Sequence, residues 1–290
     1  MIQKIKKLLK RIPFLIPLIS WKYSERGLFK FNIINVLKEF PLYKPYSAGD
    51  YKSKSILTIN TIKTIFPIIN KLLMKVQNAK SKIIFIPIEA KDISVNKQSR
   101  DKLYKLFNYY GSDKSIEYCT IYTDFFSDRL SVQKVLEIGM GTNNSKVVSN
   151  MGKGGHPGAS LRAFRDFLPN ALINGADIDE NILFSEERIK TYKVDQTEIG
   201  SLSDLKESIG TGFDLVIDDG LHSPDANLNT LLLGLEIIKV NGLVLIEDIP
   251  MTEEHKFLWN IIINILNCDS YEVKFYKAKS SFVLAIKKLS

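Results

Sequence analysis

The sequence is poor in the residues that build disulfide frameworks and zinc sites. Among its 290 residues there are two cysteines and three histidines. Cys119 and Cys268 have no metal-ligand spacing between them, and two cysteines cannot form a disulfide framework. This scarcity favours a reducing compartment, so we expect a cytoplasmic protein.

A hydrophobic run long enough to cross a membrane is also missing from the sequence. The apolar stretch 12–19 is interrupted by Pro13 and Pro17, whereas a membrane-spanning helix needs about 20 apolar residues. Because no small-x-small cleavage pattern follows this stretch, we expect neither a transmembrane segment nor export.

Net positive charge is concentrated in the first thirty residues. The net charge is +8, and residues 1–30 hold eight basic side chains against one acidic side chain, so only one net charge remains for 31–290. A basic groove is therefore not expected, nor is a nucleic-acid partner. Residues 1–30 are predicted to form a basic amphipathic arm. Either this arm contacts an anionic membrane surface, which would make the protein membrane-peripheral, or it packs on its own body or a sister subunit.

The remaining chain divides by pattern at about residue 100. Residues 31–100 carry no catalytic motif and are predicted to form a small accessory or oligomerisation domain, with a strand over 82–88 that Pro87 places at an edge or end. From Asp101 onward the pattern becomes regular, so 101–290 is the expected catalytic domain. Helices are predicted over 101–110 and 122–130.

Apolar runs separated by helix-length segments predict an α/β fold with a mostly parallel, Rossmann-like sheet. The last two runs are joined by a short link that permits only an antiparallel hairpin. The first of the seven expected strands begins at Lys134 and runs straight into a glycine turn within the stretch 134–141. The other six are residues 171–177, 189–195, 213–219, 242–248, 271–278 and 281–287.

A glycine turn follows the first of these strands and indicates a nucleotide site. Gly139 and Gly141 are present, but Asn144 stands where the dinucleotide fingerprint G-x-G-x-x-G has its third glycine. Glu137, two positions before the turn, fits an S-adenosylmethionine (SAM) site better. The missing glycine and the terminal hairpin disfavour a dinucleotide-dependent oxidoreductase.

Polar side chains at the ends of the next two strands suit the same ligand. Asp177 closes the second strand, where it can accept hydrogen bonds from ribose hydroxyls, and Asp195 and Gln196 close the third, near an adenine edge. One such acid is commonly a helix cap. Several along one edge of a parallel sheet favour a ligand site, because ligands bind outside the carboxyl ends of the strands.

The densest polar group follows the fourth and fifth strands. It contains Asp218, Asp219 and His222 after one strand, and Glu247 and Asp248 after the other. Crowded carboxylates repel one another unless a cation joins them, and oxygen ligands suit Mg²⁺ or another hard divalent ion. The histidine can act as a general base on a sugar hydroxyl. The competing interpretation is a set of helix caps without metal and a core histidine.

Seven motifs between Tyr109 and Leu289 resemble the SAM-dependent, metal-dependent sugar O-methyltransferases, such as the macrolide-sugar enzymes of mycinamicin and tylosin biosynthesis and their relatives encoded with polysaccharide genes. These motifs are residues 110–115, 135–139, 157–166, 175–179, 194–197, 218–222 and 246–249.

The resemblance implies a role for each matching residue and a self-associating protein. It implies Asp219, Glu247 and Asp248 as metal ligands, with His222 as the base acting beside Asp219. The cofactor positions that it implies are Glu137, Gly139, Gly141, Ser160, Arg162, Asp177, Asp195, Gln196 and Asp218.

Two features depart from the family pattern. From Gly141 to Asp177 there are 36 residues, against roughly 20 in the usual spacing. The surplus is mostly the polar, glycine-rich loop 143–157, a candidate lid. Residues 117–119 read Glu-Tyr-Cys where relatives often carry His-Gly-Tyr, which leaves the acceptor open.

The sequence therefore predicts an O-methyltransferase that uses SAM and a divalent metal on a hydroxyl of a sugar or glycoconjugate precursor. Two alternatives stay open: an O-methyltransferase for a non-sugar acceptor, such as a phenol or a phosphate-type group, and a non-catalytic SAM-fold binding protein. A nucleic-acid amino-methyltransferase is disfavoured because residues 218–221 read Asp-Asp-Gly-Leu instead of Asn/Asp-Pro-Pro-aromatic.

Overall fold

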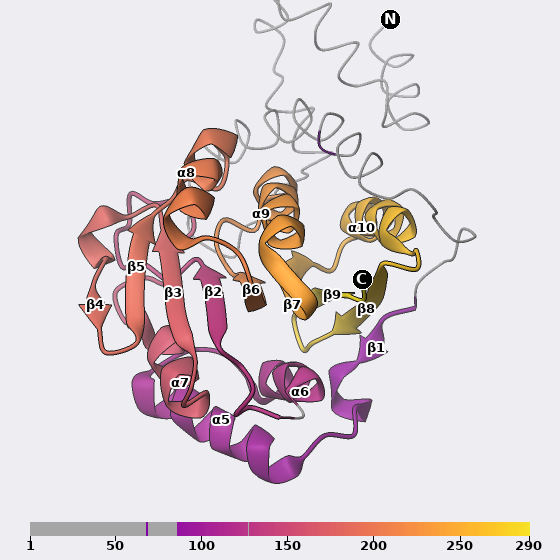
Figure 1. The fold of residues 1–290 in the computed structure, drawn as a ribbon, viewed down its shortest axis with the longest axis horizontal. Coiled ribbons are helices and arrows are strands. Elements are labelled where there is room, and N and C mark those ends of the chain that lie inside the picture. Colours follow the sequence, from indigo (N-terminus) through magenta and orange to yellow (C-terminus); the bar gives the residue numbers. More distant parts are fainter. Residues whose placement is uncertain (1–67, 69–85, 127) are drawn as a thin grey trace, which may run out of the picture.

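The computed structural model describes residue 68 and residues 86–126 and 128–290 (Figure 1). The basic arm predicted over 1–30 lies outside these residues, as does most of the accessory domain predicted over 31–100. Of the strand expected over 82–88, only residues 86–88 are described.

A single sheet runs through the described part of the chain, in the order β1-β8-β9-β7-β6-β2-β3-β5-β4. Its strands are β1 (Ile88–Glu89), β2 (Lys134–Ile138), β3 (Leu172–Asp177), β4 (Ser185–Glu186), β5 (Ile189–Lys193), β6 (Phe213–Asp218), β7 (Ile238–Pro250), β8 (Tyr271–Lys277) and β9 (Ser281–Lys288).

The pairing confirms the predicted topology. Strands β5, β3, β2, β6 and β7 are parallel neighbours, while β9 runs antiparallel to both β7 and β8. The predicted number of seven strands is wrong, because the sheet has nine. The two additional strands, β1 and β4, have two residues each and lie at the sheet's edges. Such short strands leave no periodicity in the sequence.

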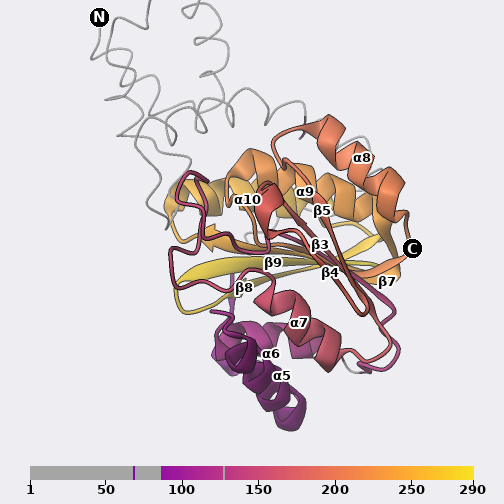
Figure 2. The ribbon, with the colours of Figure 1, turned by 90° about the vertical axis from the view of Figure 1, so that its left-hand side faces the viewer.

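Helices cover both faces of the sheet, with α5, α6 and α7 on one side and α8, α9 and α10 on the other (Figure 2). In the described part of the chain, none of the helices is long and apolar enough to cross a membrane. The helix bounds are α5 (Lys97–Tyr110), α6 (Ile116–Phe125), α7 (Ala159–Phe167), α8 (Ile199–Ile209), α9 (Pro224–Ile237) and α10 (Glu253–Leu266), with short 3₁₀ turns at Ala90–Asp92 and Glu180–Ile182.

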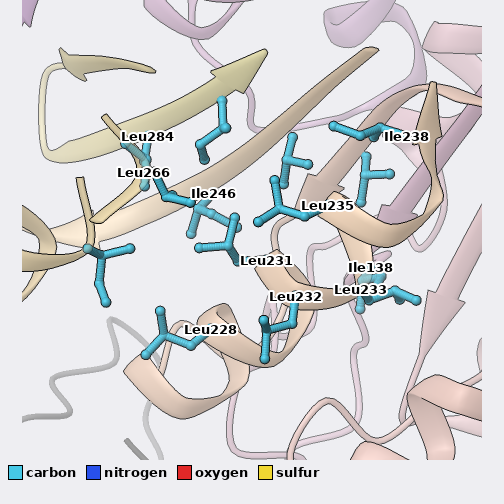
Figure 3. Packing of buried hydrophobic residues seen from close by; sticks show 14 of the residues in the cluster. Ile138, Leu228, Leu231, Leu232, Leu233, Leu235, Ile238, Ile246, Leu266 and Leu284 are labelled. Atoms are coloured by element: carbon cyan, nitrogen blue, oxygen red, sulfur yellow. The ribbon is translucent and has the colours of Figure 1, made fainter. Parts of the chain in front are cut away.

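Each face of the sheet buries its own hydrophobic cluster. On one face, Leu228 and Leu231 of α9 pack in the same cluster as Ile246 of β7 and Leu284 of β9 (Figure 3). Burying apolar side chains of this size contributes about 1.5–3 kcal/mol each. Because α9 follows β6 directly, this packing fixes the loop between them.

The second cluster lies under α5, α6 and α7 and is rich in aromatic rings. Phe164 of α7 makes edge contacts with Phe107 of α5 and Tyr122 of α6, with ring centroids 5.4 Å and 5.1 Å apart. Edge-to-face geometry is the favoured arrangement of such rings. The packing fixes Tyr122 beneath the sheet, where its hydroxyl reaches β7.

The two predicted helices before β2 differ from the observed ones. Helix α5 begins at Lys97 instead of Asp101, because the Asn96 side chain accepts a hydrogen bond from the Ser99 amide (3.0 Å) and caps the helix. It ends at Tyr110, as predicted, and Gly111 caps it in a left-handed conformation (φ 78°). Helix α6 covers Ile116–Phe125 instead of 122–130.

Candidate active site

A cavity of about 560 Å³ lies at the carboxyl ends of the parallel strands. Ligands of open α/β sheets bind at this edge. Four predicted site residues, Glu137, Arg162, Asp218 and Glu247, do not line the cavity. The predicted residues that do line it are Gly139, Gly141, Ser160, Asp177, Asp195, Gln196, Asp219, His222 and Asp248.

The glycine turn after β2 forms one wall of the cavity. Gly139 and Gly141 have φ angles of 95° and 75°, a region that L side chains rarely adopt. A Cβ atom on Gly141 would lie 1.7 Å from the sulfur of Met151. The left-handed backbone therefore favours glycine at both positions, whereas the close neighbour of Gly141 is a flexible side chain that can move.

Asp177 at the end of β3 holds this turn in place. Its Oδ2 accepts a hydrogen bond from the Met140 amide (2.9 Å) and its Oδ1 accepts one from the Asp179 amide (3.0 Å). Burial raises the pKa of Asp177, although these backbone hydrogen bonds oppose the shift. Asp179, to which the sequence analysis gave no role, also lines the cavity and accepts a hydrogen bond from the Thr142 hydroxyl (2.5 Å).

The polar residues after β5 and β6 form a scaffold at the cavity floor. The Gln196 carboxamide donates to Asp218 (2.9 Å) and accepts from the Leu221 amide (2.8 Å). Asp218 also accepts from Asn227 of α9 (3.0 Å). Asp218 is fully buried, and in this structure its hydrogen bonds hold the loop after β6 in place. Asp195 accepts hydrogen bonds from both the amide and the hydroxyl of Thr197 (2.8 and 2.6 Å).

Asp219, His222 and Asp248 converge beside the glycine turn. One ligand atom from each lies within 4.8 Å of the other two, and His222 Nε2 is 3.9 Å from an oxygen of each carboxylate. His222 and Asp248 both have left-handed backbones, with φ of 57° and 50°. Such conformations are costly outside glycine and cluster at functional sites.

Among the described residues, one oxygen of each aspartate accepts a hydrogen bond from another side chain, and the other oxygen faces His222. Ser281 also forms a hydrogen bond with Asp248. Oδ2 of Asp219 accepts from Lys114 (2.8 Å), and Oδ1 faces His222. Oδ1 of Asp248 accepts from the Tyr118 hydroxyl, and Oδ2 faces His222. Burial raises the pKa of Asp248, but His222 and the Tyr118 hydroxyl outweigh it and lower that pKa below its usual value. Two carboxylate oxygens and a ring nitrogen thus face one another.

Glu247 lies behind this group, with both oxygens already bound. The Tyr122 hydroxyl donates to Oε1, and Lys114 donates to Oε2 (2.6 Å). The side chain is 2% exposed, and burial raises its pKa to about 8 against the opposing charge of Lys114. The metal-ligand set expected from the resemblance is therefore only partly assembled, and His222 occupies the third corner of the observed group.

The two remaining predicted cofactor residues are turned away from the cavity. Glu137 is fully buried and accepts from the Ser160 hydroxyl (2.6 Å). Burial raises its pKa to about 7, although the charge of Lys114 opposes the shift. Arg162 forms an ion pair with Glu186 (2.7 Å) and donates to the Pro157 carbonyl (3.0 Å), which supports the end of the loop 143–157.

The loop 143–157 contributes a large part of the wall. Asn144, residues 146–151 and His156 line the cavity, and no helix or strand interrupts the loop. The Met151 amide donates to the Thr142 carbonyl (2.9 Å), which holds the loop over the glycine turn. Its place over the cavity agrees with a lid, and its movement stays a prediction.

Three residues near the acidic group, Lys114, Tyr118 and Tyr122, were not predicted from the sequence. Lys114 lies in one of the motifs that carry the resemblance, and this was the one sign in the sequence that it belongs to the site. Its hydrogen-bond partners Asp219 and Glu247 are more than a hundred residues away in the sequence. The two tyrosines fall near the misplaced boundary of α6. Only the packing of α6 against the sheet ends brings their hydroxyls to Asp248 and Glu247.

No family model matches the chain. Among curated proteins, it is 34% identical over 119 residues to demethylmacrocin O-methyltransferase of Streptomyces fradiae, covering 40% of this chain and 27% of that protein. It is 35% identical over 132 residues to mycinamicin VI 2''-O-methyltransferase of Micromonospora griseorubida, and this match covers 44% of this chain and 30% of that protein. The chain thus matches about a third of the length of these relatives.

Among solved structures, the chain is similar to the MycE methyltransferase from the mycinamycin biosynthetic pathway in complex with Mg and S-adenosylhomocysteine (SAH). The identity is 24%, the match covers 65% of this chain and 55% of that chain, and the TM-score is 0.53. A complex of the same enzyme with Mg, SAH and mycinamycin VI gives a TM-score of 0.52 at the same identity. This likeness confirms the predicted Rossmann-like methyltransferase fold.

Proposed function

We propose that the chain is a SAM-dependent, divalent-metal-assisted O-methyltransferase that acts on a hydroxyl of a sugar or glycoconjugate precursor. One observation carries the proposal: a single cavity joins the glycine turn of a methyltransferase fold to the group Asp219, His222 and Asp248. Curated relatives named as O-methyltransferases of demethylmacrocin and of a rhamnosyl tetracenomycin support the acceptor class.

The chemistry of the acidic group fits a hard divalent cation. Asp219 Oδ1 and Asp248 Oδ2 face the same space as His222 Nε2, and the other oxygen of each carboxylate accepts from Lys114 or Tyr118. Carboxylate oxygens with few competing ligands suit Mg²⁺. A cation bound there would hold the acceptor oxygen and make its hydroxyl more acidic.

His222 is proposed as the general base. Its Nδ1 is buried and has no hydrogen-bond partner among the described residues, while Nε2 faces the two aspartates. In this orientation Nε2 can take the proton of an acceptor hydroxyl within hydrogen-bond reach. His222 lines the cavity with a left-handed backbone, a conformation that is energetically unfavourable for histidine and is common at functional sites.

Glu247 has a more distant role in this proposal than the resemblance implies. Lys114 and Tyr122 donate to its two oxygens and it does not line the cavity, so binding a cation there would require its side chain to move. Until then it acts through Lys114, which also holds Asp219. The cofactor half of the cavity has the simpler task of orienting the donor methyl group in line with the acceptor oxygen. The turn at Gly139 and the acids after β3 and β5 are proposed to bind SAM.

A screen for methyl uptake from labelled SAM tests the acceptor class. Nucleotide sugars, glycolipid intermediates and phenols would be offered in Mg²⁺ and in EDTA. We expect a sugar hydroxyl to take up the methyl group in Mg²⁺ but not in EDTA. Uptake by phenols but not sugars would favour the non-sugar alternative. Binding of SAH without uptake by any of the acceptors would favour a non-catalytic binding protein.

Three finer proposals rest on the sequence and the resemblance. The first is a role in polysaccharide or natural-product synthesis, in the cytoplasm. The second is self-association, which light scattering of the full chain would test. The third is membrane-peripheral binding through the basic residues of 1–30, which sedimentation with phosphatidylserine vesicles would test, with neutral vesicles as the control.

A further inference from the structure

The side-chain nitrogen of Lys114 lies among three carboxylates. It is 2.6 Å from Glu247 Oε2, 2.8 Å from Asp219 Oδ2 and 3.4 Å from Glu137 Oε1. The lysine side chain is 4% exposed. A buried ammonium with three carboxylates around it is the arrangement expected of an occupied cation site, since each charge alone would be costly to bury.

The three carboxylates come from three neighbouring strands of the sheet. Glu137 lies in β2, Asp219 follows β6 and Glu247 lies in β7, and these strands pair side by side in that order. Lys114 comes from the link between α5 and α6, which belongs to a different layer. The rings of Tyr118 and Tyr122 flank the nitrogen, with both centroids 5.8 Å away, within the range of a cation–π contact.

Asp219 is shared between this ammonium and the group that faces the cavity. Its Oδ2 contacts Lys114, while its Oδ1 faces His222 and Oδ2 of Asp248. The acids thus surround two adjacent cation positions that have one carboxylate in common. We infer that Lys114 permanently fills the inner position, so that the site accepts one exchangeable divalent cation, in the outer position, instead of two.

Lys114 is a positioning residue in this inference, because it acts through Asp219 and Glu247. It orients Asp219 so that one oxygen points outward, and it keeps Glu247 out of the outer position. Its positive charge also limits how tightly the outer cation binds, since like charges in a partly buried site repel. The part of the inference that concerns the outer cation rests on the proposed function. The occupation of the inner position by an ammonium group does not.

Chemical rescue tests the inner position without any metal. Lys114→Ala leaves the buried carboxylates without a cation, so the melting temperature (Tm) of the full chain in EDTA should fall by about 10 °C. Because the removed atoms have the shape and charge of a propylammonium ion, the Tm should largely recover in propylammonium chloride. In 1-propanol, which has nearly the same shape but no charge, it should stay low. Lys105→Ala, on the exposed face of α5, is the matched control and should respond to neither compound. Equal recovery in both compounds would overturn the inference.

A magnesium titration tests the outer position. The wild-type chain should bind one Mg²⁺, and Lys114→Ala should bind two, returning to one in propylammonium. Lys114→Met keeps most of the buried stem without the charge, so it stays informative if the alanine variant does not fold. It should bind Mg²⁺ about tenfold or more tightly than wild type. Unchanged or weaker binding by Lys114→Met would overturn the inference. Absence of Mg²⁺ binding by the wild-type chain would count against the proposed function alone, because the rescue in EDTA would still stand.

Discussion

A Cβ atom on Gly139 would lie 2.2 Å from the carbonyl oxygen of Asp219. The glycine turn after β2 and the acidic group after β6 are therefore in direct contact. The Asp219 amide also donates to the Ile138 carbonyl (2.8 Å). A cofactor seated on the turn and a cation held by Asp219 would be immediate neighbours, as methyl transfer to a metal-held oxygen requires.

Gly139→Ala should disrupt both halves of the site. The new methyl group collides with backbone atoms of Asp219, and the φ of 95° is unfavourable for alanine. We expect a loss of about 1–3 kcal/mol in the free energy of unfolding and loss of SAH binding, measured by denaturant titration and calorimetry. Gly200→Ala is the control, because a Cβ there meets nothing within 4 Å. If Gly139→Ala bound SAH as wild type does, the turn would not be the cofactor site.

His222→Ala should separate binding from transfer. The ring faces the two aspartates and not the polar scaffold that holds the cofactor half of the cavity. SAH affinity should therefore stay within about twofold, while the transfer rate on a sugar acceptor falls by roughly 100-fold or more. Single-turnover transfer from labelled SAM gives the rate. Full turnover by this variant would contradict the assignment of the base.

Asp219→Asn should act first on the metal. The substitution keeps the side-chain shape but removes a charge from the group that faces the cavity. We expect Mg²⁺ affinity to fall by at least about tenfold, because even mutation of residues that only hydrogen-bond to metal ligands lowers metal affinity by that factor. The transfer rate should fall with it. Asp204→Asn, on the exposed side of α8, serves as the control. Equal Mg²⁺ affinities in the two variants would remove Asp219 from the ligand set.

Glu137 should make stability depend on pH. Burial raises its pKa from 4.5 to about 7, against the opposing charge of Lys114, so the folded chain holds this proton when the unfolded chain has lost it. Its contribution to the free energy of unfolding is thus full below pH 4.5 and decreases as the pH rises toward 7.

The test of this dependence is the Tm measured in EDTA between pH 5 and pH 8. Glu137→Gln keeps an acceptor for the Ser160 hydroxyl but has no proton to lose. The Tm of wild type should decrease more over this interval than the Tm of Glu137→Gln. Parallel curves for the two proteins would show that Glu137 does not titrate in this range.

Much of the sheet could be predicted because buried parallel strands are short, unbroken apolar runs. The apolar run 243–246 is an example, and it lies in β7 of the structure. The helix α6 was misplaced because Ile116–Phe125 is apolar on several sides and has little helical periodicity. Its consecutive buried residues, from Cys119 to Thr123, follow from packing between α5 and the sheet, which local pattern does not contain.

The acidic ends of the strands could also be predicted, because parallel topology alone brings Asp219 and Asp248 to one edge. The orientation of each side chain could not. Glu247 and Asp248 are adjacent in sequence, yet one turns inward to Lys114 and the other faces the cavity. That difference depends on a lysine from the α5–α6 link and on the left-handed backbone at Asp248, both of which are tertiary features.

Calorimetric titration of the wild-type chain with SAH, in Mg²⁺ and in EDTA, tests most directly whether this cavity is a metal-assisted SAM site. We expect SAH to bind under both conditions, Mg²⁺ to bind with one equivalent, and NAD to give no heat. Binding of NAD without binding of SAH would contradict the proposed activity.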